Sequence, residues 1–196
     1  GVGNLFSLRS SFAAIGVEAF VSGDAAELAK ADRLVLPGVG AFGDAAEKLR
    51  QSGLDTFVKE QAASGKPLLG ICLGMQLLFD KSYEYVEYDG LGLINGEIRP
   101  IADVIGEGLS IPHIGWNNLR YPNVGRLYKD IPEDSYVYFV HSYYLQAEDK
   151  EIVVATTEYG TTIHASVEQG NVFACQFHPE KSGTVGLTIL KNFAEL

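Results

Sequence analysis

The feature that most constrains this fold is an apolar segment followed at once by a turn with glycines on both sides of a cysteine. Residues Pro67 to Ile71 form a predicted buried strand, and Gly70-Ile71-Cys72-Leu73-Gly74 leads from it into a predicted helix. The two glycines permit a tight, strained turn whose central side chain projects clear of the sheet. The pattern therefore predicts a buried strand that presents Cys72 at its carboxyl end.

The first half of the chain alternates helix and strand signals around this turn. Short strands are predicted at Val17 to Val21 and Arg33 to Leu36. The first predicted helix follows an Asn4 cap and ends at Gly16, and the second follows the capping-box pattern of Asp24 and Glu27. Further helices are predicted at Asp44 to Gln51, at Leu54 to Ser64 and after Cys72. Strands separated by helices indicate parallel pairing, with helices on both faces of the sheet.

The second half is rich in β-branched and aromatic residues. The strand-like segments are Ser135 to Leu145, Glu151 to Tyr159, Thr161 to Glu168 and Asn171 to Phe177. Gly160 and Gln169-Gly170 are predicted hairpin turns, and Gly183 to Leu196 is a predicted final helix. We therefore expect a single α/β domain over residues 1–196, with a mostly parallel central sheet extended by antiparallel strands.

Composition narrows the function classes. The chain has 196 residues, 46% of them hydrophobic, and 15 basic against 25 acidic side chains, so its net charge is 15 − 25 = −10. The hydrophobic content argues against disorder, and the acidic balance argues against a nucleic-acid or anionic-membrane surface. No apolar stretch reaches the roughly 20 residues of a membrane span.

Cysteine and histidine usage indicates neither disulfides nor a metal site. Cys72 and Cys175 are too few for a disulfide framework and lack zinc-site spacing, so we expect a reducing, cytoplasmic compartment. His113, His141 and His164 share no ligand spacing, and we expect them to be packed or surface histidines. We expect no metal and no cofactor.

Cys72 has the position of a nucleophile. The start of a helix favours a thiolate, and the amide N–H of Leu73 would point at an oxyanion formed when Cys72 attacks a carbonyl. The alternative is a buried core cysteine beside structural glycines.

The segment His178-Pro179-Glu180 supplies a base for this nucleophile. It follows a predicted strand, and an extended backbone would place His178 and Glu180 on one face, where the carboxylate could fix the imidazole tautomer. The alternative is a surface turn that happens to contain a histidine. Together with Cys72, the segment predicts a Cys–His–Glu triad.

A glycine-rich loop, Pro37-Gly38-Val39-Gly40, also follows a predicted strand. Its exposed N–H groups could hold an oxyanion, but it lacks the Lys-Ser/Thr of a phosphate-binding loop. The loop lies at the carboxyl edge of a sheet, where open α/β sheets carry their sites, and this position favours a functional role for it.

With these motifs the chain resembles the class I (triad) glutamine amidotransferases, which have a flavodoxin-like fold. More narrowly, it is similar to the glutaminase subunits of imidazole glycerol phosphate synthase. Beyond the triad and glycine-rich motifs, the narrower resemblance rests on Gly1-Val2-Gly3-Asn4, Ile114-Gly115-Trp116-Asn117, Val140-His141-Ser142-Tyr143 and Lys181-Ser182-Gly183. The family has a short apolar strand before the first of these motifs, and we expect the natural protein to contain it.

The resemblance implies a reaction and its residues. Cys72 would attack the side-chain amide of L-glutamine to give a γ-glutamyl thioester and ammonia, and His178, oriented by Glu180, would move the protons. Oxyanion stabilisation would fall to Val39, Gly40 and Leu73. The residues that would hold glutamine are Gly40, Gln76, Glu84, Ser142 and Tyr143. A carboxylate at Glu84 suits the α-ammonium group of the substrate.

The resemblance also implies a partner. One glutaminase domain uses the whole chain, so the ammonia must pass to a (β/α)₈-barrel cyclase subunit in a heterodimer. That subunit makes imidazole glycerol phosphate and an aminoimidazole carboxamide ribonucleotide in histidine biosynthesis. The candidate docking residues are Trp116, Asn117, Tyr138 and Lys181. We expect weak glutaminase activity without this partner, because a glycine-rich oxyanion loop can rest in an inactive conformation.

Three other functions fit parts of the pattern. A Cys–His–Glu hydrolase of γ-glutamyl peptides would work alone, and Met75-Gln76 after the turn argues against it. A noncatalytic binding subunit would not need an intact triad. The glutaminase of pyridoxal phosphate synthesis is similar in size, and the segments at Ile114 and Lys181 favour the histidine pathway over it.

Overall fold

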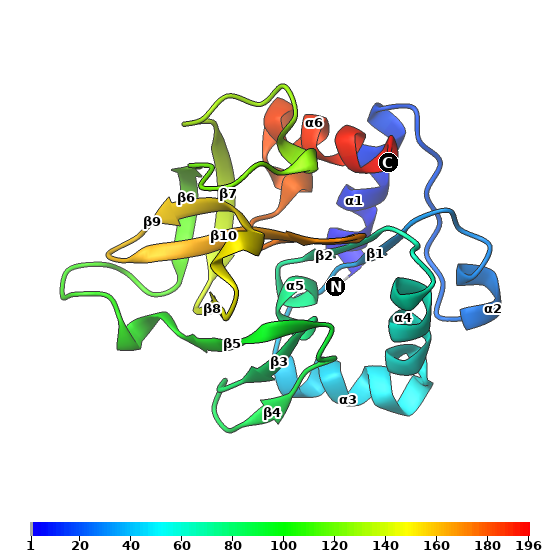
Figure 1. The fold of residues 1–196 in the computed structure, drawn as a ribbon, viewed down its shortest axis with the longest axis horizontal. Helices are drawn as coiled ribbons and strands as arrows, with labels where there is room; N and C mark the ends of the chain where they lie inside the picture. Colours follow the sequence, from blue (N-terminus) through cyan, green and yellow to red (C-terminus); the bar gives the residue numbers. More distant parts are fainter. Residues whose placement is uncertain (1) are drawn as a thin grey trace.

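A five-stranded mixed sheet forms the centre of the molecule in a computed structural model that describes residues 2–196 and side chains from Asn4 onward (Figure 1). Gly1 of the opening motif lies outside these residues. The strand order is β1-β2-β11-β10-β9. Their bounds are β1 Leu34–Leu36, β2 Leu68–Ile71, β9 Val153–Glu158, β10 Thr162–Gln169 and β11 Val172–Cys175. The first three strands in this order are parallel, and β10 and β9 continue antiparallel.

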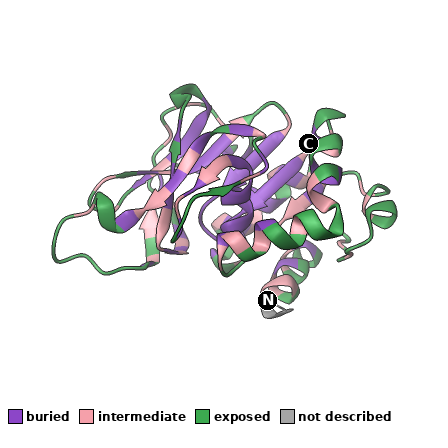
Figure 2. Cartoon of the chain, turned by 90° about the horizontal axis from the view of Figure 1, so that it is seen from below, coloured by how far each residue is buried: buried purple, intermediate pink, exposed green. Residues whose placement is uncertain are grey.

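Strand β2 is buried along its whole length because helices cover both faces of the sheet. Leu69 and Ile71 lie in one hydrophobic core with α1 and α6, whereas Leu68 lies in a second core with α4 and α5. Since successive side chains of a strand point to opposite faces, one apolar run serves both cores. The buried residues in Figure 2 are concentrated on these central strands, and the outer helix faces are exposed.

Two groups of helices flank the sheet (Figure 1). One face packs α1 and α6, and the other packs the helices that follow β1 and β2. The helices are α1 Val2–Ala14, α2 Ala25–Leu28, α3 Phe42–Ser52, α4 Leu54–Ala63, α5 Leu73–Leu77 and α6 Gly183–Ala194, with 3-10 turns η1 Ile101–Asp103, η2 Arg126–Tyr128, η3 Lys150–Ile152 and η4 Pro179–Lys181.

Two smaller sheets come from the region between residues 79 and 147. A four-stranded sheet has the order β4-β3-β5-β8, and a two-stranded sheet pairs β6 with β7. Their bounds are β3 Phe79–Ser82, β4 Tyr88–Asp89, β5 Ile94–Pro100, β6 His113–Asn118, β7 Tyr136–His141 and β8 Tyr143–Ala147. The predicted strand at Ser135 to Leu145 is therefore two strands in different sheets, which meet at Ser142.

The α/β class is confirmed, as is a parallel centre extended by antiparallel strands, although β11, from the second half of the chain, joins the parallel part beside β2. Three local expectations are wrong. Asn4 lies inside α1 rather than capping it, because the helix already begins at Val2. Val17 to Val21 form no strand, because no segment within residues 2–196 pairs with them in a ladder. Asp24 caps α2 as expected and accepts a hydrogen bond from the Ala26 amide, but Glu27 does not complete a capping box, because the Asp24 amide donates to Ser22 Oγ instead, at 3.0 Å.

Candidate active site

Cys72 occupies a strained turn between β2 and α5. Its backbone has φ 54° and ψ −113°, a conformation that non-glycine residues rarely adopt. The flanking glycines make the turn possible, since a Cβ at Gly74 would lie 1.7 Å from the carbonyl oxygen of Leu36, and one at Gly70 would lie 2.9 Å from the Gly74 oxygen. Strain of this kind is concentrated at functional sites, where the surrounding structure holds it in place.

The glycine-rich loop after β1 packs against this turn. A Cβ at Gly38 would lie 3.3 Å from Leu73 Cβ and 3.4 Å from Gly74 N, so the two segments touch at the carboxyl edge of the sheet. Val39 is 46% exposed, and Gly40 has φ 98° in the left-handed region. The structure therefore brings Val39, Gly40 and Leu73 into one neighbourhood, with the loop free on its outer side.

His178 and Glu180 form a short, fully buried pair. His178 Nδ1 lies 2.6 Å from Glu180 Oε1, and the two side chains are 1% and 0% exposed. The backbone is not extended across the pair as expected, because Pro179 begins the turn η4. The carboxylate reaches the imidazole from that turn, and Ser182 Oγ donates to the His178 carbonyl oxygen at 2.6 Å.

The surroundings of His178 favour its protonated form. Burial lowers its pKa, but the neighbouring Cys72 and Glu180 outweigh burial and raise the pKa to about 9. Its Nε2 atom has no hydrogen-bond partner among the described residues, whereas Nδ1 is held by the carboxylate. An imidazole fixed at one nitrogen and open at the other can give and take a proton, as a triad requires.

Buried polar groups surround the Cys72 side chain. Cys72 Sγ lies 3.9 Å from the carbonyl oxygen of Val140 and 3.8 Å from Gln176 Nε2. Gln76 Nε2 donates to Gln176 Oε1 at 3.1 Å and to the Tyr143 carbonyl oxygen at 3.3 Å. Sequence reasoning missed Gln176, although a polar residue in the apolar run before His178 is a signal for it.

Glu84 is buried and anchored at the start of α3. Its carboxylate accepts a hydrogen bond from Phe42 N at 3.2 Å. Burial raises its pKa, the Phe42 hydrogen bond lowers it, and Asp44 raises it, with a net upward shift. Burial and the charge of Glu84 also raise the pKa of Tyr143. The charge of Glu84 therefore acts on the Tyr143 side chain, although the two residues are far apart in sequence.

The four candidate docking residues lie on or beside the β6–β7 sheet. Trp116 is 55% exposed, and its ring makes an edge contact with Tyr138, with centroids 6.0 Å apart. Lys181 is exposed on η4, next to Glu180. Asn117 lies on the opposite side of β6 from Trp116, and its amide donates to the Glu158 carbonyl oxygen at 2.9 Å.

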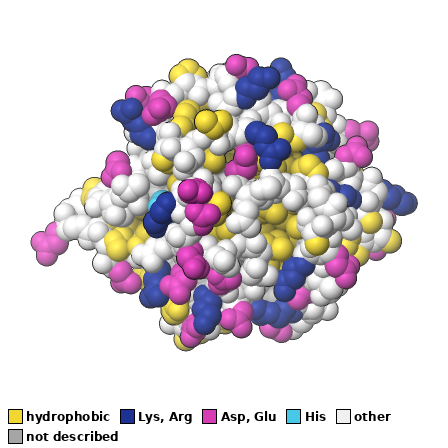
Figure 3. Space-filling view, in the orientation of Figure 1, with side chains coloured by type: hydrophobic (Ala, Val, Ile, Leu, Met, Phe, Trp, Pro, Cys, Tyr) yellow, Lys and Arg dark blue, Asp and Glu magenta, His cyan; other side chains and the backbone are white. Residues whose placement is uncertain are grey.

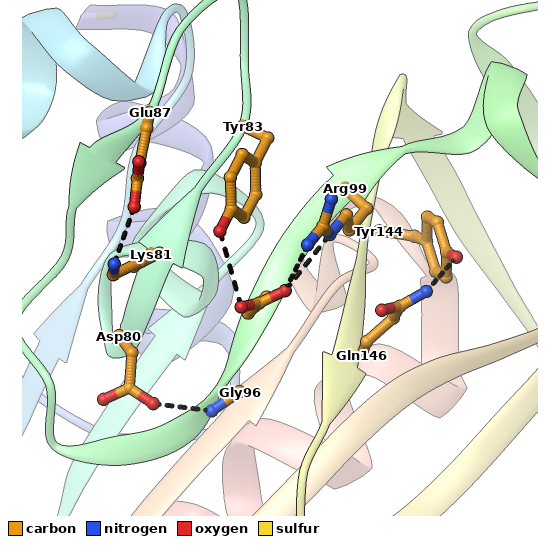
Figure 4. Close-up of polar contacts among 9 residues, drawn as sticks. Asp80, Lys81, Tyr83, Glu87, Gly96, Arg99, Tyr144 and Gln146 are labelled. Carbon is orange, nitrogen blue, oxygen red and sulfur yellow. Dashed lines mark hydrogen bonds and ion pairs between the residues drawn. The ribbon is translucent and has the colours of Figure 1, made fainter.

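A polar groove of about 900 Å³ lies elsewhere, over β3, β5 and β8. None of its lining residues belongs to the candidate triad. Figure 4 shows that several polar groups of the groove are already hydrogen-bonded within the protein: Lys81 to Glu87, the Gly96 amide to Asp80 and Gln146 to Tyr144. The groove therefore offers few free groups to a ligand.

Other titratable groups show no metal site. Among the described residues, no three His, Cys, Asp or Glu side chains gather to hold a metal ion. Cys175 is fully buried, as expected of a structural thiol, and burial raises its pKa to about 12.

The described surface carries both charge signs. On the face in Figure 3, acidic and basic side chains are interspersed. In the part of the chain that the structure describes, no helix combines the length and apolar character needed to cross a bilayer.

Comparison with known proteins gives one consistent family. The family model described as glutamine amidotransferase class-I matches residues 7–196. Imidazole glycerol phosphate synthase subunit HisH of Wolinella succinogenes is 49% identical over 196 residues, which span 100% of this chain and 96% of that protein. The same subunit of Moorella thermoacetica is 46% identical over 196 residues, which span 100% of this chain and 91% of that protein.

Solved structures agree on the fold. A crystal structure described as a glutamine amidotransferase superposes with a TM-score of 0.74 at 20% identity, covering 96% of this chain and 91% of that chain. The acivicin-bound glutaminase domain of Trypanosoma brucei CTPS superposes with a TM-score of 0.66 at 15% identity, covering 97% and 88% of the two chains.

Proposed function

The chain belongs to the class I glutamine amidotransferases and, within them, to the family of imidazole glycerol phosphate synthase subunit HisH, and on this premise we propose that it hydrolyses L-glutamine at Cys72 and passes the ammonia to a cyclase subunit. The observation that carries the proposal is the strained Cys72 turn beside the buried His178–Glu180 pair.

The first half-reaction forms the thioester. Cys72 Sγ attacks the amide carbon of glutamine as the thiolate, and the protonated imidazole of His178 gives its proton to the departing nitrogen, which leaves as ammonia. The pKa of about 9 for His178 supports this role, because the imidazole is protonated at neutral pH. The developing oxyanion would be stabilised by amide groups of Leu73 and of the Val39–Gly40 segment.

The second half-reaction restores the enzyme. His178, now neutral, takes a proton from water, the oxygen attacks the thioester carbon, and glutamate leaves as sulfur is released. Glu180 keeps the imidazole in one orientation through both steps, since it holds Nδ1 at 2.6 Å.

Substrate binding would use the polar wall beside Cys72. Glu84 would accept the α-ammonium group of glutamine, and Gln76, Gly40, Ser142 and Tyr143 would contact the rest of the substrate. The buried carboxylate of Glu84 at the start of α3 supports this assignment, because an ammonium group is the natural partner for such a charge.

The ammonia acceptor would be a (β/α)₈-barrel cyclase subunit that docks on the β6–β7 sheet and on Lys181. Ile114, Trp116 and Tyr136 each expose more than half of their surface there, which favours a partner-binding face. A catalytic thiol needs reducing surroundings, and we propose that the complex works in the cytoplasm, with residues 1–196 acting as one glutaminase domain.

The test is glutamate release from glutamine by the purified chain. It is run alone, with a cyclase subunit and its nucleotide ligand, and with Cys72→Ala, while Cys175→Ala serves as the matched control. We expect release with the liganded partner, a loss of at least about 10³-fold in Cys72→Ala, and little change in Cys175→Ala.

Three results would contradict the proposal. Glutamate release that persists in Cys72→Ala would remove the nucleophile assignment. A verified complex that releases no glutamate would favour a binding role, and hydrolysis of γ-glutamyl peptides by the chain alone would favour a peptidase.

A further inference from the structure

A line of hydrogen bonds runs from strand β6 to the proposed glutamine site. Asn117 Nδ2 lies 3.3 Å from His113 Nε2, His113 Nδ1 lies 2.9 Å from His141 Nε2, and His141 Nδ1 lies 2.8 Å from the Tyr143 carbonyl oxygen. His113 and His141 are 3% and 6% exposed. Neither histidine has a role in the triad.

The chemistry of the atoms fixes the direction of each bond. A carbonyl oxygen only accepts, so His141 Nδ1 must carry the proton that it donates to Tyr143. In a neutral imidazole, His141 Nε2 is then an acceptor, and His113 Nδ1 must donate to it. His113 Nε2 is in turn the acceptor for Asn117 Nδ2, which has hydrogens to donate. Every bond in the line is satisfied only when both histidines are neutral and protonated at Nδ1.

Burial supports the neutral state. Burial lowers the pKa of His113 to about 4. Burial is also the main reason that the pKa of His141 falls to about 3, while the Tyr143 hydrogen bond opposes the fall and His113 and His178 add to it. Phe139 and Tyr159 stack on the His113 ring, with centroids 4.8 and 4.0 Å away. This packing leaves little space for the ring to turn.

The line of hydrogen bonds ends at the junction between strands β7 and β8. Strand β7 ends at His141 and β8 begins at Tyr143, so the chain passes between two sheets at Ser142. The Tyr143 carbonyl oxygen receives hydrogen bonds from two side chains there, His141 and Gln76. These two bonds occupy both lone pairs of the oxygen and hold it against Gln76, whose amide also bonds Gln176, the side chain that contacts Cys72.

We propose that His113 and His141 are positioning residues for glutamine binding: His113 fixes the tautomer of His141, and His141 holds the Tyr143 carbonyl oxygen in the wall of the site. This inference rests on the proposed function, because it assigns the supported wall to glutamine. It also gives strand β6, on the proposed docking face, a direct connection to that wall.

The first test is the protonation state of the two rings, read from their ¹⁵N chemical shifts in the intact chain. We expect both rings to stay neutral and Nδ1-protonated between pH 5.5 and 8, although His178 carries its proton nearby. A ring that is protonated at Nε2, or that becomes charged in this range, would overturn the proposed line. This test does not depend on glutaminase activity.

The second test uses matched amide substitutions in the complex with the cyclase. His113→Asn keeps a donor near the position of Nδ1, whereas His113→Gln moves the amide to the position of Nε2. We expect His113→Gln and His141→Gln to raise the KM for glutamine about tenfold with kcat within about threefold, and the Asn variants to recover most of that loss. His164→Asn, which changes a half-buried histidine outside the line, is the control.

The outcomes distinguish a failure of the proposed glutaminase function from a failure of the proposed positioning role of the two histidines. If the wild-type complex releases no glutamate, the proposed function fails, and the ¹⁵N measurement still decides the tautomers. If the wild type is active and His113→Asn and His113→Gln have the same KM, the positioning role is wrong. If the Gln variants do not fold, as judged by circular dichroism, the ¹⁵N result and the Asn variants decide.

Discussion

At the scale of single residues, the site depends on a few side chains whose surroundings alter their chemistry. Cys72 is held at a positive φ, and His178 is buried against a carboxylate that keeps its proton in place. Both properties come from neighbours on other elements. A substitution of one such neighbour should therefore change the chemistry before it changes the fold.

Glu180→Gln tests this at the proposed base. The variant keeps the shape of the side chain but removes the charge, so we expect the pKa of His178 to fall from about 9 and kcat to fall by about 10³-fold. A pH titration of His178 by NMR, together with steady-state kinetics, checks both. An unchanged pKa would show that Glu180 does not govern the imidazole.

The same pair predicts how stability depends on pH. The pKa of His178 is raised in the folded chain, so its contribution to stability is full below the unfolded value of about 6.5 and is lost as pH rises through about 9. We expect the free energy of unfolding to differ more between wild type and Glu180→Gln at pH 6 than at pH 10. Denaturant titrations at both values check this, with the exposed Glu133→Gln as the control.

At the scale of elements, the site exists because β1, β2 and α5 approach within backbone contact. A Cβ added at Gly74 would lie only 1.7 Å from the carbonyl oxygen of Leu36, so the two backbones leave no room for a side chain there. We expect Gly74→Ala to lower the free energy of unfolding by about 3 kcal/mol, because strand and helix must separate. Gly23→Ala is the control, since a Cβ there meets nothing within 4 Å. Equal stabilities in a urea titration would show that the contact is not needed.

At the scale of the whole molecule, the β6–β7 sheet exposes aromatic and aliphatic side chains, and we propose that the cyclase subunit docks on this face. Trp116 contributes a large exposed aromatic surface there, in contact with Tyr138. We expect Trp116→Ala to weaken cyclase binding by about 10- to 100-fold, as measured by titration calorimetry, with little change in thermal stability. Val124→Ala, which changes a residue 95% exposed outside this sheet, should bind as wild type does.

The sequence alone determined the features that depend on local order. The apolar run before Cys72 indicates a buried strand, and the glycines around it permit a turn that other residues resist, so the strand and the strained turn at Cys72 were predictable. Helices α3, α4 and α6 and the strands on either side of Gly160 and Gly170 also follow from periodicity and turn residues, because these signals lie within a few positions of one another.

Only the tertiary structure decided what depends on distant partners. Val17 to Val21 has strand-like residues, yet a strand needs a ladder partner, and none pairs with it within residues 2–196. The chain also changes sheets at Ser142. The contact of Gln176 with Cys72 joins residues 104 positions apart, and the His113–His141 pair joins residues 28 positions apart. No local pattern encodes such pairings, because they arise when the packed sheets bring separate segments together.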